Sequence, residues 1–153
     1  MSEESKQFLK SIVFQLNKEE YAMPVDLVGS IERMMHITRV PGTPNFVKGV
    51  LNLRGVVTPI IDLRSRFGFD DLSYTESTRM IIIHPNNMEV GLIVDAAYDV
   101  IDIPNEKIEP APEVVGTERI EYIDGVAKLE DRLLILLNID KVLSHESIKS
   151  LAK

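Results

Sequence analysis

The sequence predicts a mainly β protein built from two similar barrel-like halves, with short helices and a helical C-terminal tail. Three observations lead to this prediction. Short aliphatic runs recur along the 153 residues, turn-forming residues separate them, and the second half repeats the apolar pattern of the first. Many short strands at close spacing are typical of small β-barrels or sandwiches.

The repeat becomes visible when the chain is shifted against itself by 69 positions. Residues 11–41 then align with residues 80–110 without a gap and share 6 identities in 31 pairs, where roughly two are expected by chance. The identical pairs are Ile12/Ile81, Asn17/Asn86, Glu20/Glu89, Val25/Val94, Asp26/Asp95 and Pro41/Pro110. The offset then grows by seven, so that Gly49 meets Gly125, and the extra residues fall in the polar loop around Glu113 and Glu118. These two registers indicate an internal duplication.

Each half is expected to contain the same elements. In the first half, residues 11–16 and 21–24 form a hairpin around a polar turn, a short segment spans 26–34, and residues 49–63 form a strongly apolar hairpin. In the second half the corresponding elements are 79–84 with 89–94, then 95–103, then the hairpin 125–139. The prolines at positions 41, 44, 104, 110 and 112 are expected to exclude regular ladder pairing between these elements.

Helices are few in this prediction. Residues 64–67 and 140–143 are expected to form short turns of helix, and residues 144–151 a C-terminal helix with Ser144 as N-cap. The polar stretch 68–77 marks the boundary between halves. We therefore predict one domain over residues 1–153, with a first barrel subdomain at 8–74, a second at 75–143 and a helical tail at 144–153.

Composition excludes several classes of protein. The chain has 17 basic and 24 acidic residues, for a net charge of −7, which disfavours binding to nucleic acid. It contains no cysteine, so disulfides, thiolate catalysis and cysteine metal sites are absent. Neither a signal peptide nor an apolar run of membrane-spanning length is present. We expect a cytoplasmic protein without direct membrane insertion.

No sequence motif indicates catalysis, a metal or a cofactor. The three histidines, His36, His84 and His145, lack the spacing of metal ligands, and the 8 glycines form no phosphate-binding loop. Serines lack a nucleophile elbow. Asp62 and Asp95 follow strands, where solvated turn positions are the ordinary interpretation.

Two features point instead to a protein partner. The turn Arg54-Gly55 places a guanidinium on an otherwise aliphatic surface, so Arg54 is expected to be paired or to serve a contact. The second copy has Glu130-Asp131 there, so the two turns should not bind the same partner. The aliphatic residues Val28, Ile31, Ala97 and Val100 occupy equivalent places in the two copies. They either fill the barrel cores or line a groove between the barrels.

Four segments resemble the CheW family of bacterial chemotaxis coupling proteins. They are residues 47–63 (VKGVLNLRGVVTPIIDL), 38–41 (TRVP), 89–95 (EVGLIVD) and 131–136 (DRLLIL). The similarity extends from Phe8 to Leu143 in the family's order.

The resemblance implies two SH3-like barrels packed around a shared apolar interface. It implies an adaptor that links chemoreceptor cytoplasmic tips to the regulatory domain of the histidine kinase CheA, in receptor arrays where kinase domain and adaptor alternate in rings. The receptor's helical hairpin is expected in the groove between the barrels, at Val28, Ile31, Gly49, Arg54, Ala97 and Val100. Kinase-contact residues are not assigned. Some relatives have an acidic partner for Arg54 where this chain has Ser30, with Glu32 two residues on, so the pairing of Arg54 stays open.

Other interpretations remain at this point. One is a CheV-like adaptor without its receiver domain. Another is an enzyme or small-molecule-binding protein built on paired barrels, which a deep polar pocket with converging Asp62, Asp95 or histidine side chains would favour. A nucleic-acid-binding barrel would need a basic face, against the net charge of −7.

Overall fold

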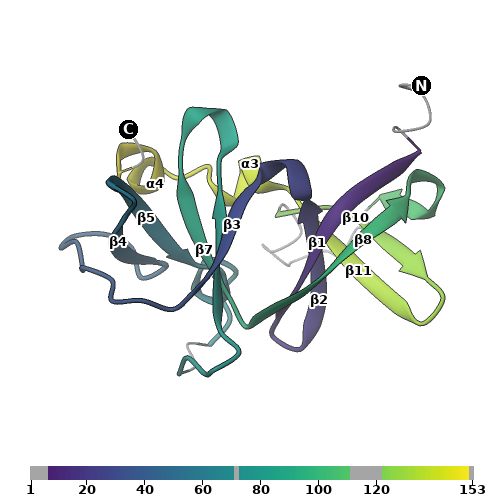
Figure 1. The fold of residues 1–153 in the computed structure, drawn as a ribbon, viewed down its shortest axis with the longest axis horizontal. Helices are drawn as coiled ribbons and strands as arrows, with labels where there is room; N and C mark the ends of the chain where they lie inside the picture. Colours follow the sequence, from purple (N-terminus) through teal and green to yellow (C-terminus); the bar gives the residue numbers. More distant parts are fainter. Residues whose placement is uncertain (1–6, 71–72, 111–121, 152–153) are drawn as a thin grey trace.

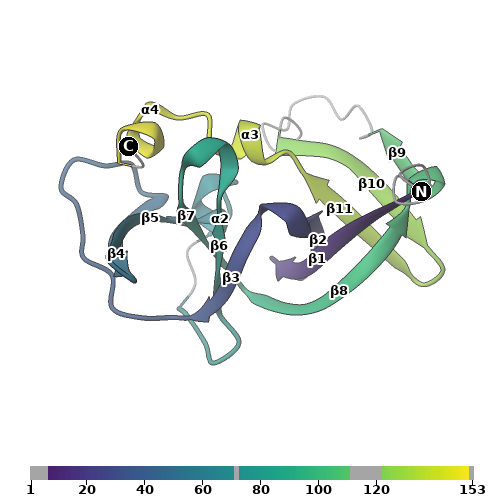
Figure 2. The ribbon, with the colours of Figure 1, turned by 45° about the horizontal axis from the view of Figure 1, so that its top comes forward.

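The computed structural model describes residues 7–70, 73–110 and 122–151. Its strands form two sheets that lie beside each other along the long axis of the molecule (Figures 1 and 2). Module A is the sheet with strand order β8-β1-β2-β11-β10-β9, and module B is the sheet with strand order β3-β6-β7-β5-β4. The predicted mainly β fold with two modules and short helices is confirmed.

The predicted hairpins correspond to observed strands within a few residues. The strands are β1 (Phe8–Leu16), β2 (Glu19–Pro24), β3 (Val28–Arg33), β4 (Val47–Leu53), β5 (Val56–Asp62), β6 (Arg79–Ile83), β7 (Val90–Val94), β8 (Ala96–Pro104), β9 (Ile108–Pro110), β10 (Ile123–Leu129) and β11 (Arg132–Leu137). The helices are α2 (Leu63–Arg66), α3 (Ile139–Val142) and α4 (Glu146–Leu151), with single 3-10 turns η1 (Val25–Leu27), η2 (Pro85–Asn87) and η3 (Asn105–Lys107).

The two sheets do not coincide with the two halves of the sequence. The β1–β2 hairpin of the first half pairs with β8 and β11 of the second, and the β6–β7 hairpin of the second half pairs with β3 and β5 of the first. The predicted bounds 8–74 and 75–143 can therefore describe the sequence repeats but not the two sheets, since each sheet takes strands from both ranges. Only Asp95 separates β7 from β8, too few residues to reverse the chain in a hairpin, so the chain continues into the other sheet.

Each sheet closes on itself by a short backbone pairing at its edge. In module B, Thr38 and Val50 exchange backbone hydrogen bonds of 2.9 and 2.8 Å, which join the segment after β3 to β4. In module A, β9 pairs with β10 through Glu109 and Val126. These closures turn both sheets into barrels, as the repeated sequence pattern predicts.

Three apolar clusters hold the fold together. A small one fills module A, around Val13, Ala22 and Leu134, and another fills module B, around Ile60, Met80 and Ile82. The central core lies between the modules and takes side chains from both sheets and from the helices. In β6, Met80 and Ile82 point into module B while Ile81 and Ile83 point into the central core. Burial on both faces explains the uninterrupted aliphatic runs in the sequence.

The C-terminal segment leaves module A after β11 and brings α4 onto module B. Ile139, Val142 and Ile148 belong to the central core, and α4 contacts β5 (Figure 2). Arg66 secures this segment, since its guanidinium lies 4.7 Å from the Phe46 ring centroid and its Nε donates a 2.8 Å hydrogen bond to the Val142 carbonyl.

Two local expectations are wrong. Pro104 and Pro110 do take part in ladders, at the ends of β8 and β9, because proline is tolerated at strand ends and sheet edges. The helix α4 begins at Glu146, two residues after Ser144, and the Ser144 hydroxyl donates a 2.7 Å hydrogen bond to the Lys141 carbonyl of α3. Pro112 and the polar loop insertion lie outside the described residues.

Candidate functional site

The four aliphatic residues singled out in the sequence lie on the facing surfaces of the two modules. On β3, Val28 pairs with Ile83 and Ile31 pairs with Ile81. Both partners belong to the central core, and directly paired antiparallel residues point to the same face. Val28 and Ile31 therefore face module A.

The equivalent residues of β8 have the mirror-image arrangement. Val100 pairs with Ile12 and Ala97 pairs with Phe14, and both partners again belong to the central core. Among the described strands, β3 is bonded to β6 alone and β8 to β1 alone, so each stands at one end of the strand order of its sheet. The four residues thus mark the line where the central core reaches the surface, and we name Val28, Ile31, Ala97 and Val100 the seam rim.

Burial divides the seam rim into two pairs. Val28 and Ala97 are half-buried and pack against the central core, whereas Ile31 is 40% and Val100 52% exposed. Val28 and Ala97 therefore pack between the modules and not in the small core of either barrel, while Ile31 and Val100 are exposed beside them. The space between the modules is filled by their own side chains, and the exposed pair borders that filling with apolar surface.

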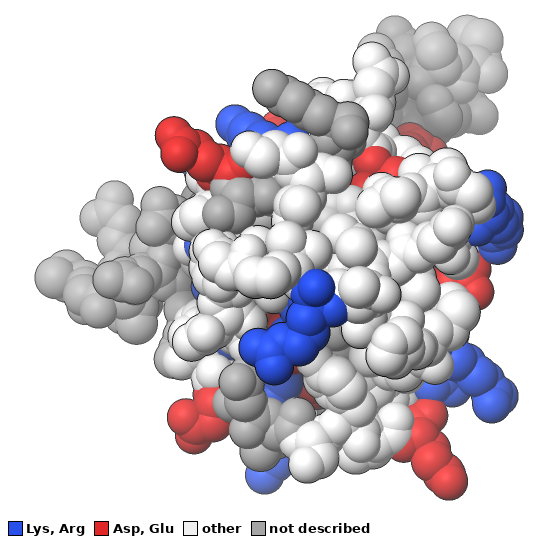
Figure 3. Space-filling view, turned by 90° about the vertical axis from the view of Figure 1, so that its left-hand side faces the viewer, with Lys and Arg blue, Asp and Glu red and all other residues white. Residues whose placement is uncertain are grey.

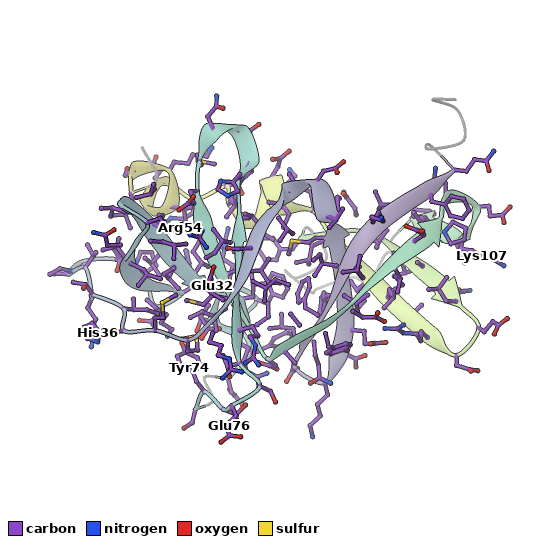
Figure 4. The ribbon with its side chains drawn as sticks, viewed as in Figure 1. Glu32, His36, Arg54, Tyr74, Glu76 and Lys107 are labelled. Atoms are coloured by element: carbon purple, nitrogen blue, oxygen red, sulfur yellow. The ribbon has the colours of Figure 1, made fainter. Side chains whose placement is uncertain are left out.

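Arg54 lies at the tip of the β4–β5 hairpin, which has left-handed backbone at Arg54 (φ 53°) and Gly55 (φ 84°). Its Nη2 is 3.2 Å from Glu32 Oε2 on β3, so the open question of its partner is answered (Figure 4). The Arg54 side chain is 72% exposed, and Val56 and Val57 beside it are 46% and 60% exposed. Two exposed aliphatic side chains therefore follow the Arg54-Gly55 turn in the chain.

Gly49 lies inside the protein, at the closure of module B. A Cβ on this residue would overlap the Thr38 carbonyl oxygen, and its φ is +142°. Its equivalent Gly125 approaches the Glu109 carbonyl oxygen in the same way. Gly49 therefore serves the barrel closure, where no side chain fits, and lies at the other end of β4 from the Arg54 turn.

One polar cluster was missed by the sequence analysis. Arg132 binds Glu20 through two hydrogen bonds, of 3.0 and 2.9 Å, and Asp99 through a third of 3.1 Å. These bonds hold the pKa of the Glu20 carboxyl below its usual range and raise that of the guanidinium. The Tyr98 hydroxyl donates a 2.6 Å hydrogen bond to Glu20. Burial, and then this bond, raises the pKa of Tyr98 to about 12.

A polar pocket of about 680 Å³ lies at the junction of the modules and contains both Asp62 and Asp95. Their carboxylates are engaged. Asp95 accepts hydrogen bonds of 2.8 Å from Arg64 Nη1 and from the Asn17 backbone amide, and Asp62 accepts from the Arg64 amide and the Tyr74 hydroxyl. The cluster joins module B to the first turn of module A. The carboxylates of Asp62 and Asp95 thus serve structural hydrogen bonds.

The remaining chemical alternatives find no support among the described residues. Within residues 7–70, 73–110 and 122–151, no group of three or more histidine, aspartate or glutamate side chains is placed to hold a metal ion. In the same ranges, no helix has the length and apolar character needed to cross a bilayer. The end of the molecule at module B is largely uncharged near its middle apart from a small group of basic side chains, and both basic and acidic side chains lie towards its margin (Figure 3).

Known proteins resemble this chain over nearly its whole length. The CheW-like domain family matches residues 10–147. The chain is 46% identical over 150 residues to the chemotaxis protein CheW of Bacillus subtilis (98% of this chain, 96% of the relative). It is 42% identical over 137 residues to the chemotaxis protein CheW of Klebsiella aerogenes (90% and 82%). The crystal structure of the scaffolding protein TtCheW from Thermoanaerobacter tengcongensis superposes with a TM-score of 0.83 at 34% identity (90% and 94%).

Proposed function

The chain belongs to the CheW family of chemotaxis scaffold proteins, and on that premise we propose that it joins chemoreceptor cytoplasmic tips to the regulatory domain of the kinase CheA. The resemblance noted in the sequence, the fold that it implies and the role as a non-catalytic coupling scaffold are confirmed. The named partners, the cytoplasmic location at receptor arrays and the contact residues belong to the proposal.

The seam rim is the proposed receptor-binding surface. The observation that carries this assignment is the exposure of Ile31 and Val100 at 40% and 52% on the facing surfaces of two modules whose shared core is already filled. An amphipathic helical hairpin can lay its apolar face on such a surface. Each exposed residue stands on a strand and pairs with a residue of the central core.

Arg54 is the proposed polar anchor of the same contact. Its guanidinium is exposed and pairs with one carboxylate, that of Glu32. An acidic or carbonyl group of the receptor can therefore take the place of water on the guanidinium without breaking a buried ion pair. Burying an aliphatic side chain contributes about 1.5–3 kcal/mol, of which docking and ordering remove a large part. We expect micromolar affinity for one receptor tip and stronger retention in an array through multivalency.

Capture by a receptor cytoplasmic fragment tests this proposal. Ile31→Asp and Val100→Asp should each weaken capture at least about tenfold, because each places a charge against apolar receptor surface. Phe8→Asp is the matched control, since Phe8 is also an exposed apolar residue (49%) but lies on β1 opposite Pro104. If spectra show that both rim variants are folded and the receptor fragment is captured as well as by the wild type, the assignment is wrong.

Reconstitution with CheA and receptor fragments tests the coupling itself. The intact chain should raise receptor-dependent kinase activity, and the rim variants should lose that effect while still binding the isolated kinase regulatory domain. If kinase activity is independent of the chain, the proposed coupling is wrong.

A further inference from the structure

Two arginines lie directly opposite each other at the end of the β3–β6 ladder. Arg33 is the last residue of β3 and Arg79 the first residue of β6, and the two are partners in the antiparallel register. Directly opposite residues point to the same face with their Cβ atoms about 5 Å apart, and like charges at such positions repel. This pair therefore opposes folding unless an anion lies beside it.

The described side chains do not supply that anion. Arg79 Nη1 donates hydrogen bonds of 2.7 and 2.9 Å to the backbone carbonyls of Glu76 and Thr78, in the turn before β6 where Figure 4 labels Glu76. Within residues 7–70, 73–110 and 122–151, no carboxylate forms an ion pair with Arg33 or Arg79. Arg33 is exposed and Arg79 half-buried, so both guanidinium groups keep donors for a ligand.

A hollow of about 650 Å³ brings the two arginines together with this turn. Arg33, Met34, Arg79 and the turn residues 75–78 line it. The Thr75 hydroxyl oxygen accepts a 3.1 Å hydrogen bond from the Ser77 amide, which leaves the hydroxyl proton for another acceptor. The hollow therefore offers two guanidinium groups and a hydroxyl donor around one space.

These donors are complementary to an oxyanion with two negative charges. A phosphate monoester has close to two charges at neutral pH and three acceptor oxygens, so it can bond to both guanidinium groups together. A carboxylate has one charge and two oxygens and would leave one arginine uncompensated. Glu76 places one negative charge against the two positive ones, so the hollow stays positive, although the net charge of the chain is −7.

We propose that this hollow binds the phosphoryl group of a small phosphate monoester. Arg33 and Arg79 donate to separate phosphoryl oxygens, and the Thr75 hydroxyl donates to the third. Binding removes the repulsion across the β3–β6 ladder and so stabilises the folded chain. The site uses no residue of the seam rim and needs no receptor, so it does not rest on the proposed function.

A titration of the ¹⁵N-labelled full chain with N-acetyl-O-phosphoserine amide at pH 7.5 tests the site directly. We expect saturable amide shifts at residues 33, 75, 77 and 79, with a dissociation constant of about 1 mM. Inorganic phosphate should shift the same residues, because the phosphoryl group is what the site recognises. N-acetyl-aspartate amide, with one charge, should bind at least about tenfold more weakly. Equal binding of the aspartate compound, or shifts confined to other residues, overturns the proposal.

Charge-removing variants separate this site from general attraction to positive charge. Arg33→Gln and Arg79→Gln should each abolish the saturable shifts. Arg39→Gln is the matched control, because Arg39 is an exposed arginine that lines a different cavity, and it should bind the ligand as the wild type does. If all three variants weaken binding equally, the arginine pair is not a specific site and the proposal is wrong.

Arg33→Glu provides an independent test through stability. A glutamate opposite Arg79 turns the repulsive pair into an attractive one, so the thermal midpoint should rise by about 2 °C. At ten times its dissociation constant, the phosphoserine compound should raise the midpoint of the wild type by about 4 °C and leave that of Arg33→Glu unchanged. A lower midpoint for Arg33→Glu, or stabilisation of this variant by the ligand, would contradict the proposed arrangement.

Discussion

Arg132 and Arg54 both bind glutamates, but their surroundings imply different contributions to the stability of the fold. Arg132 makes three hydrogen bonds that span β2, β8 and β11, whereas Arg54 makes one contact with Glu32 at the exposed tip of a hairpin. Charge networks with bidentate geometry contribute to stability, while single exposed pairs contribute little. Arg132 is therefore expected to stabilise the fold, and Arg54 to contribute to binding.

Arg132→Gln should lower the free energy of unfolding by about 1 kcal/mol and the thermal midpoint by ~2–4 °C. The pH dependence follows from Glu20, whose folded pKa lies below its usual value of 4.5 because of the bonds from Arg132. Its contribution is present above pH 4.5 and is lost as pH falls through the folded pKa. Urea unfolding between pH 7 and pH 3 should show the wild type and variant converging in acid, and a constant difference would contradict this.

Arg54→Asn should separate stability from binding. The left-handed φ of 53° at Arg54 suits asparagine, which is favoured in such two-residue turns, and the lost ion pair is exposed. We expect the free energy of unfolding to rise by about 0.5 kcal/mol while receptor capture falls. Chemical denaturation measures the expected rise in unfolding free energy, and the capture assay on the same preparation measures the expected loss of receptor binding. A variant that loses both would indicate a structural role for the guanidinium.

Residue roles could be predicted only where neighbours in sequence determine them. The Arg54-Gly55 turn was visible in the chain because two adjacent residues define it. The Arg132 network was not, since 112 positions separate Arg132 from Glu20 and only the parallel pairing of β11 with β2 brings them together. Likewise, Gly49 was identified by resemblance, but its contact with Thr38 depends on closure of the barrel.

At the scale of elements, the hairpins were predictable and the barrel closures were not. Alternation and turn residues indicated β1–β2, β4–β5, β6–β7 and β10–β11, because each is a local structure. The short strand β9 was overlooked because prolines flank it, and proline at an edge does not prevent pairing on its other side. Each barrel closure joins two segments that are distant in sequence. The feature that the two closures share in the sequence is a glycine facing the closing carbonyl, Gly49 in module B and Gly125 in module A.

Gly49→Ala tests the closure of module B. Its Cβ would overlap the Thr38 carbonyl oxygen, and its φ is unfavourable for alanine, so the variant should lose about 3 kcal/mol of unfolding free energy. Gly42→Ala is the matched control, because Gly42 also has a positive φ of +80° but no atom lies within 4 Å of the place that its Cβ would take. It should lose about 1 kcal/mol. Equal losses in urea unfolding would show that backbone strain alone matters.

For the whole molecule, the exchange of hairpins makes two repeats into one cooperative unit. Sequence periodicity revealed the duplication but not which sheet each hairpin joins, because either pairing satisfies the same apolar pattern. The structure settles this through the short β7–β8 connection and through Asp95, which accepts from Arg64 and Asn17 and whose amide donates a 3.0 Å hydrogen bond to the Gln15 carbonyl. Relative rotation of the modules would break these bonds and open the central core, so the seam rim is held at a fixed width.

Neither repeat should therefore fold alone. A fragment of residues 1–74 contains β1–β2 without their partners β8 and β11, and a fragment of residues 75–153 contains β6–β7 without β3 and β5. Each would expose its share of the central core and an unpaired strand edge. Spectra of the separate ¹⁵N-labelled fragments should show unfolded chains, and an equimolar mixture should recover the dispersion of the intact protein. If either fragment alone gives a dispersed, cooperatively melting spectrum, its hairpin can close within its own repeat, and the modules are independent units.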